Sequence, residues 1–156
     1  MFTSISGRSV LVTGGTKGIG KGLAASFAAE GANVMIVGRD REAGERAAAE
    51  LAASGKVAFE QGDVGSAASC AAVVAAAEEL HGGLDIVCCN AGIFPSARLE
   101  EMTPEQLEEV LATNLKGTFF VVQAALPALR RSGRGRVIVT SSMLPRRPSG
   151  IAASIA

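Results

Sequence analysis

The sequence predicts an α/β fold: a doubly wound parallel sheet with helices on both faces and five expected strands. Short apolar runs alternate with longer segments of helical pattern along the 156 residues. This alternation is typical of βαβ units, in which right-handed crossovers place helices on both sides of a parallel sheet. The composition agrees, because 48% of the residues are hydrophobic and only 19% are charged, which suits strands buried on both faces.

The apolar runs give the expected strands, and their flanking residues give the helix ends. Gly31 closes the first helical segment, and Thr103-Pro104 has the N-cap and first-turn residues of a helix start. The helix that begins there is expected to run to about residue 131, and Pro127 is the place where it would bend. Residues 143–156 have no clear period and are expected to form an irregular tail. The expected strands are residues 10–12, 34–37, 57–59, 84–89 and 136–142.

Charge and composition argue against several partners. The 15 basic and 15 acidic residues cancel and aromatic residues make up only 4%, so neither nucleic acid nor a membrane surface is an expected partner. No apolar stretch is long enough to span a bilayer, and the N-terminus does not resemble a signal peptide. Cys70, Cys88 and Cys89 lack metal-binding spacing and are expected to be buried hydrophobic residues in a cytoplasmic protein without a metal site. The lone His81 is expected at the surface.

The stretch from Val10 to Gly20 predicts a phosphate-binding site. Three apolar residues lead into a glycine cluster, and a helical pattern begins at Ile19. A strand, a tight turn and a helix start gather backbone N–H groups at the positive end of the helix dipole. One alternative is a glycine-rich turn with no ligand. Another is an ATP-binding P-loop, but Gly22 stands where that motif needs a serine or threonine for magnesium, so a dinucleotide site is favoured.

The residues after the second expected strand bear on which dinucleotide binds. An acidic residue at this place accepts hydrogen bonds from the ribose hydroxyls of NAD, whereas a basic one accommodates the 2′-phosphate of NADP. Arg39 follows the strand, and Lys17 in the glycine loop is expected to reach the same place. Asp40 is the residue that favours NAD. The two cations favour NADP, and NAD stays the alternative.

Several sequence features together resemble the short-chain dehydrogenase/reductase family over about residues 6–143. They are, in chain order, Thr13-Gly-x-x-x-Gly-Ile-Gly20, Asp63-Val64, Asn90-Ala91-Gly92, Asn114 and Ser141-Ser142. The sequence most resembles the bacterial members known as 3-oxoacyl-carrier-protein reductases or as generic ketone and alcohol oxidoreductases. The resemblance implies that residues 1–142 form a Rossmann-type dinucleotide-binding domain, with hydride transfer between NADP or NAD and a small-molecule carbonyl or alcohol. It also implies a homo-oligomer.

The resemblance assigns roles to single residues. Asn114 matches the asparagine that supports a proton-relay water, and Ser142 matches the serine that hydrogen-bonds the substrate carbonyl. Such groups are needed because hydride delivery to a ketone develops negative charge on its oxygen. The positions that match cofactor contacts are Gly14, Thr16, Lys17, Gly18, Ile19, Gly20, Arg39, Asp63, Val64, Asn90, Ala91 and Gly92.

The sequence departs from the family at the proton donor. The family uses a tyrosine in a Tyr-x-x-x-Lys motif, but the chain contains no tyrosine, and Ile155 stands at the expected position. Ser149 and Ser154 are far weaker acids than a phenol. We therefore interpret the sequence as a truncated or frameshifted member. It is either an enzyme by lineage with an incomplete catalytic set or a nucleotide-binding remnant without turnover.

The interpretation as a truncated member has a physical consequence. The expected strand 136–142 becomes a sheet edge with apolar side chains on both faces. The helix that carries Phe119, Phe120 and Val122 also loses cover. The sequence therefore predicts poor solubility or low stability, and the homo-oligomer of the family becomes doubtful for this chain.

Overall fold

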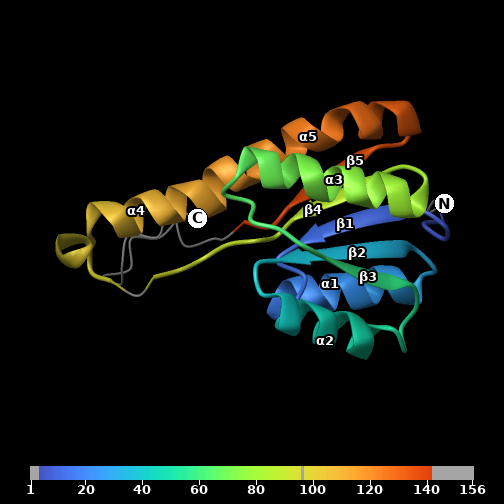
Figure 1. The fold of residues 1–156 in the computed structure, drawn as a ribbon, viewed down its shortest axis with the longest axis horizontal. Coiled ribbons are helices and arrows are strands. Elements are labelled where there is room, and N and C mark those ends of the chain that lie inside the picture. Colours follow the sequence, from blue (N-terminus) through green and yellow to red (C-terminus); the bar gives the residue numbers. More distant parts are fainter. Residues whose placement is uncertain (1–3, 96, 142–156) are drawn as a thin grey trace.

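The computed structural model describes residues 4–95 and 97–141, which form a five-stranded parallel sheet between two layers of helices (Figure 1). The strand order β3-β2-β1-β4-β5 confirms the doubly wound α/β fold. The strands are β1 (Ser9–Thr13), β2 (Asn33–Gly38), β3 (Val57–Gln61), β4 (Ile86–Cys89) and β5 (Arg136–Val139). The α-helices are α1 (Gly18–Ala29), α2 (Arg41–Leu51), α3 (Ala67–His81), α4 (Pro104–Val110) and α5 (Gly117–Ser132). A short 3-10 helix, η1 (Leu99–Glu101), and a π-helical turn, η2 (Leu111–Lys116), complete the list.

Alternate residues of the strands supply two cores, one on each face of the sheet. In β1, Val10 and Val12 pack in the core that α1 and α2 cover, whereas Leu11 packs under α3 and α5 (Figure 1). Cys88 and Cys89 of β4 divide in the same way, because neighbours in a strand point to opposite faces. All three cysteines are free and buried, as predicted, and burial raises the pKa of Cys88 to about 12.

The helix predicted from residue 103 to about 131 is continuous but not uniform. Thr103 and Gln106 form a capping box at the start of α4, with each side chain accepting a hydrogen bond from the other residue's backbone N–H. Between α4 and α5, η2 is wider than an α-helix. Nothing in the hydrophobic pattern predicts this turn. Pro127 lies inside α5.

At least one end of each strand differs from the predicted one, by one to three residues. β3 continues to Gln61, beyond the predicted 57–59, because it pairs with β2 as far as Gly38. β5 ends at Val139 rather than at residue 142, although the N–H of Thr140 still donates to the carbonyl of Cys89 at 3.0 Å. Ser142 and the predicted tail, residues 143–156, lie outside the described residues.

A buried carboxylate joins the amino ends of β1, β4 and β5. Asp85 precedes β4 and is only 9% exposed. Its carboxylate accepts hydrogen bonds from the backbone N–H of Ser9 at 3.0 Å, from Ser132 Oγ at 2.5 Å and from Arg134 Nε at 3.0 Å. Burial alone raises the pKa of this carboxyl. The three donors and the charge of Arg134 outweigh burial and hold the pKa below its usual value of 3.8.

His81 lies beside this carboxylate cluster, at the end of α3. Gly82, with a φ of +77°, ends the helix there. The imidazole Nδ1 lies 2.9 Å from Ser9 Oγ, and the residue is half-buried. The prediction of a surface histidine is therefore wrong. Burial lowers the pKa of His81, which favours the neutral ring.

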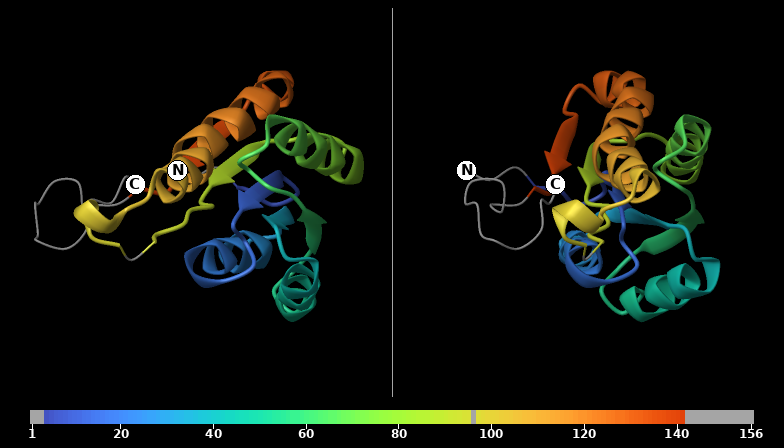
Figure 2. Two further views of the ribbon diagram at one scale, coloured as in Figure 1. Left: turned by 60° about the vertical axis from the view of Figure 1, so that its left-hand side comes forward. Right: turned by 90° about the vertical axis from the view of Figure 1, so that its left-hand side faces the viewer.

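β5 and the outward face of α5 are exposed, as predicted for a sheet edge. Val137 and Ile138 are each 42% exposed and Val139 is 52% exposed. On α5, Phe119 is 61% exposed, while Phe120 packs against the core. Figure 2 shows β5 at one side of the sheet with α5 beside it. The structure therefore has one apolar flank that is open within the described residues, whereas four of the five residues of β3 at the opposite edge are partly buried.

Two further properties concern membranes and metals. Among the described helices, none is long and apolar enough to cross a bilayer. In the same part of the chain, no group of three or more His, Cys, Asp or Glu side chains is placed to hold a metal ion.

Candidate functional site

The glycine loop joins β1 to α1 at the carboxyl edge of the sheet, and the segment after β4 holds it in place. Thr13 Oγ1 accepts hydrogen bonds from the backbone N–H groups of Asn90 and Ala91, both at 3.1 Å. The Asn90 amide Nδ2 donates to the carbonyls of Thr13 at 3.3 Å and of Gly14 at 3.4 Å. The path of the loop is therefore fixed from its inner side.

The loop is crowded on its inner side and open on its outer side. Gly14 has a φ of +65°, and a Cβ there would lie 2.8 Å from Ala91 Cα. A Cβ on Gly20 would lie 2.1 Å from the carbonyl oxygen of Gly14. Gly18 also has a positive φ, +53°, but a Cβ there would meet nothing within 4 Å. The N-cap, Lys17, makes no side-chain cap hydrogen bond within the described residues, so the start of α1 suits an anion.

The side chains around the open end of the loop argue against an ATP-binding P-loop. Lys17 is exposed, and Ile19 in the first turn of α1 is 67% exposed. Lys21, which corresponds to the phosphate-binding lysine of a P-loop, forms an ion pair with Glu50 of α2. Together with Gly22 at the magnesium position, this ion pair disfavours the P-loop alternative.

Two charged residues, Arg39 and Asp40, follow β2 at the same edge of the sheet, and their side chains have different partners. Gly38 lies close to the glycine loop, since a Cβ on it would lie 2.7 Å from Thr16 Cγ2. Asp40 is the N-cap of α2, and its Oδ1 accepts a hydrogen bond from the first helical turn at 3.0 Å. Arg39 is 59% exposed, and its Nη1 lies 3.8 Å from Glu109 Oε1. The acid that favours NAD is therefore engaged as a helix cap.

Asp63 and Val64 follow β3 at the same edge. Asp63 is exposed, and its Oδ1 accepts a hydrogen bond from the N–H of Gly65 at 2.9 Å, while its own N–H donates to Ser69 Oγ at 2.9 Å. Val64 is buried, and Gly117 lies against it, because a Cβ on Gly117 would be 2.8 Å from Val64 Cγ2. The turn is thus anchored in the core by one residue and shaped by the other.

Asn114 lies in the π turn and holds the segment that follows Asn90. Its Oδ1 accepts a hydrogen bond from the N–H of Ile93 at 2.9 Å, and its Nδ2 donates to the Ile93 carbonyl at 3.0 Å. Gly92 lies nearby, with its Cβ position 3.4 Å from Asn114 Oδ1. Wide turns of this kind are frequent at functional sites, because they turn side chains out of the regular helical register.

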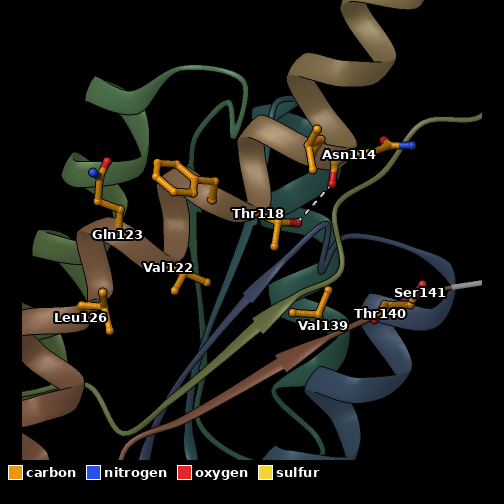
Figure 3. Close-up of a pocket in the computed structure, with 10 residues that line it drawn as sticks. Asn114, Thr118, Val122, Gln123, Leu126, Val139, Thr140 and Ser141 are labelled. Atoms are coloured by element: carbon orange, nitrogen blue, oxygen red, sulfur yellow. Dashed lines mark hydrogen bonds between the residues drawn. The ribbon is translucent and has the colours of Figure 1, made fainter. Parts of the chain in front are cut away.

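A pocket of about 620 Å³ lies between α5 and the carboxyl end of β5 (Figure 3). Asn114 of η2 and Ser141, two residues beyond the end of β5, both line it (Figure 3). Ser142, which follows Ser141 in the sequence, lies outside the described residues. The remaining lining residues are Leu115, Thr118, Phe119, Val122, Gln123, Leu126, Val139 and Thr140.

Comparison with known proteins identifies the family. The model of the short chain dehydrogenase family matches residues 8–154. The chain belongs to the short-chain dehydrogenase family. Two similar solved structures are a short chain dehydrogenase from Burkholderia cenocepacia and a metagenomic short-chain oxidoreductase, both in complex with NADP. The Burkholderia structure has a TM-score of 0.88 and 31% identity, and the match covers 96% of this chain and 61% of that protein's chain. The metagenomic structure has a TM-score of 0.86 and 30% identity, and the match covers 94% of this chain and 67% of that protein's chain.

The family match extends to curated sequences. D-beta-hydroxybutyrate dehydrogenase from Cupriavidus necator is 34% identical over 139 residues, which is 88% of this chain and 54% of that protein. Other oxidoreductases match over similar shares. This short-chain dehydrogenase chain therefore spans about half the length of the curated relatives it matches.

Two hydroxyl residues of this short-chain dehydrogenase chain hold the site, although the sequence predicts no role for either and names Thr13 only as the first residue of the glycine motif. Thr13 is 2% exposed and bridges the loop to the segment after β4. Thr140 Oγ1 donates to Asn90 Oδ1 at 3.2 Å, so the Asn90 amide is held from both sides. In each case, the sequence signal was a threonine directly after an apolar run, at the carboxyl end of a parallel strand.

Proposed function

We propose that this chain forms the cofactor-binding part of an oxidoreductase that transfers hydride between NADP(H) and a small carbonyl or alcohol substrate. The observation that carries the proposal is the glycine loop. It is closed by Asn90 and Ala91 on one side, and it is open at Gly18 beside the start of α1. A dinucleotide pyrophosphate needs this combination of close backbone approach and free N–H groups.

The residues along the carboxyl edge fit the parts of NADP in order. Arg39 lies where a cation accommodates the 2′-phosphate, while the Asp40 carboxylate is occupied as a helix cap. Asp63 and Val64 are proposed to contact the adenine. The pyrophosphate and the rest of the dinucleotide would be held by Gly14, Thr16, Lys17, Gly18, Ile19, Gly20, Asn90, Ala91 and Gly92.

The proposed chemistry needs a hydrogen-bonded carbonyl and a proton supply. The nicotinamide, when bound, supplies or accepts the hydride. Ser142 would donate a hydrogen bond to the substrate oxygen, and Asn114 would support a proton-relay water. What supports this pairing is that Asn114 and Ser141, the residue before Ser142 in the sequence, line the same pocket.

A second proposal concerns these 156 residues by themselves. They contain no tyrosine, so no phenol is present to deliver the proton to the substrate oxygen. We therefore propose that this chain binds the cofactor but does not turn over by itself. The three buried free thiols suit a reducing cytoplasm.

Calorimetric titration with NADPH and NADH tests the proposal. We expect NADPH to bind more tightly than NADH, and we expect Arg39→Gln to weaken NADPH binding by about tenfold while NADH is unaffected. A parallel assay of NADPH oxidation with a panel of keto-esters should show no turnover. Binding of neither cofactor would contradict the proposed function, and measurable turnover would contradict the proposal that the chain is inactive alone.

A further inference from the structure

We propose that Glu109 sets how strongly this chain prefers NADP over NAD, by competing with the 2′-phosphate for Arg39. The inference rests on the proposed function, because it assumes that Arg39 receives the phosphate. Glu109 is then a specificity-determining residue that acts through Arg39. It belongs to none of the sequence motifs described above.

The geometry places this carboxylate at the proposed phosphate site. Glu109 Oε1 lies 3.8 Å from Arg39 Nη1, although the two residues come from the end of α4 and the end of β2. The turn that follows α4 packs beside the Asp63–Val64 segment, since a Cβ on Gly65 would lie 3.7 Å from Ala112 Cβ. Glu109 therefore stands at the rim of the same site as the proposed adenine contact.

The charges explain the direction of the effect. Arg39 and Glu109 are 59% and 58% exposed, so their ion pair is weak and can be displaced by a ligand. A 2′-phosphate that binds Arg39 must displace the Glu109 carboxylate from Arg39. The negative charges of the phosphate and of Glu109 then lie close together and repel each other. NADH carries no 2′-phosphate and meets neither effect. Glu109 therefore weakens binding of NADPH and leaves binding of NADH nearly unchanged.

The neighbouring residue provides a matched control. Glu108 is also an exposed glutamate near the end of α4, but its Oε2 lies 3.1 Å from Lys116 Nζ and so pairs away from Arg39. Changing Glu108 to glutamine removes the same charge from the same helix end. Any general effect of net charge or of the helix dipole is therefore shared by the two variants.

The experiment compares wild type, Glu109→Gln and Glu108→Gln by calorimetric titration with NADPH and NADH at low salt. We expect Glu109→Gln to lower the Kd for NADPH by about two- to fivefold, with no change for NADH. In about 1 M salt the gain should vanish, because exposed charges are screened. In an Arg39→Gln background, Glu109→Gln should change the NADPH Kd by less than about twofold.

Two results overturn the inference. One is a Glu109→Gln variant with an unchanged ratio of NADPH to NADH affinity, and the other is an equal shift in Glu108→Gln. Both leave the proposed function intact, since wild type still binds NADPH. Failure of wild type to bind either cofactor overturns the proposed function itself, so the two failures are distinguishable.

Discussion

β1 and β5 run parallel on either side of β4, yet they differ in almost every physical respect. All five residues of β1 are buried, whereas all four residues of β5 are exposed. β1 has a paired strand on each side, while β5 pairs only with β4 in the described part of the sheet. β1 leads into the glycine loop, and β5 leads toward Ser142.

The difference shows which part of the site this sequence stabilises by itself. The cofactor edge is built around β1, where both cores meet and where the loop is held by buried hydrogen bonds. The proposed position of the substrate-binding serine, at the same edge, depends on β5, whose side chains have little cover in the described structure. Binding of the cofactor is therefore expected to be more robust than positioning of the serine.

The largest expected effect is on stability, when a large apolar side chain is shortened to alanine in β1 and in β5. Leu11 in β1 is fully buried, and Ile138 in β5 is 42% exposed. Leu11→Ala should lower the free energy of unfolding by about 2 to 5 kcal/mol. Ile138→Ala should lower it by less than about 1 kcal/mol. Urea titrations of both variants measure the two values, and equal losses would contradict the contrast between β1 and β5.

A smaller effect tests the loop that follows β1. In Gly20→Ala the new methyl group would lie 2.1 Å from the carbonyl oxygen of Gly14 and 2.5 Å from Asn90 Nδ2. This overpacking should cost about 1 to 3 kcal/mol of stability. It should also weaken NADPH binding by more than about tenfold, as measured by calorimetry.

Gly22→Ala is the matched control in the same helix. A Cβ on Gly22 would meet nothing within 4 Å, so this variant should gain about 0.5 to 1 kcal/mol and keep its NADPH affinity. If Gly20→Ala bound NADPH as well as Gly22→Ala does, the inner side of the loop would not control the site.

The smallest expected effect concerns Asp85, whose hydrogen bonds link the amino ends of β1 and β5. Asp85 accepts hydrogen bonds from Ser9 of β1 and from Arg134 before β5, and its folded-state pKa is below 3.8. Its contribution to stability is therefore present above pH 3.8 and is lost as the pH falls through the lower folded-state pKa. Asp85→Asn should cost roughly 1 kcal/mol at pH 7, with less loss of stability on acidification than wild type.

Urea unfolding of wild type and Asp85→Asn at steps from pH 7 to pH 2 measures this difference. The gap between the two proteins should narrow in acid. A constant gap across the series would show that the charge of Asp85 contributes nothing to the link between the strands.

The sequence predicts the five strands and the doubly wound parallel sheet, because these depend on features that act locally, whereas the strand order comes from the structure. Apolar runs define β1 and β2, and parallel crossovers bring the residues after each strand to one edge. The burial of Cys88 and Cys89 on opposite faces follows from strand alternation in the same way. Such features need no knowledge of distant contacts.

The parts that could not be predicted depend on contacts between distant residues. Asp40 follows β2 where an NAD-binding acid would stand, and only the start of α2 shows that it is a cap. His81 is half-buried because Ser9, far away in the sequence, lies against it. Arg39 and Glu109 form an ion pair although they are also far apart in the sequence. No local pattern reports these pairings.

The π turn of residues 111–116 has a consequence for how the chain could vary. A π turn is an α-helix with one residue inserted, so a deletion of a single residue within it could restore a regular helix without breaking the chain. Such a deletion would leave α4 and α5 at nearly the same rotation about the helix axis, because the wide turn already absorbs the extra residue, but it would narrow the turn that carries Asn114. We expect the narrowed turn to move Asn114 away from Ile93 and to break the two hydrogen bonds between them. Length in this segment is therefore as constrained as residue identity, and a one-codon deletion here should be less tolerated than most substitutions at the same positions.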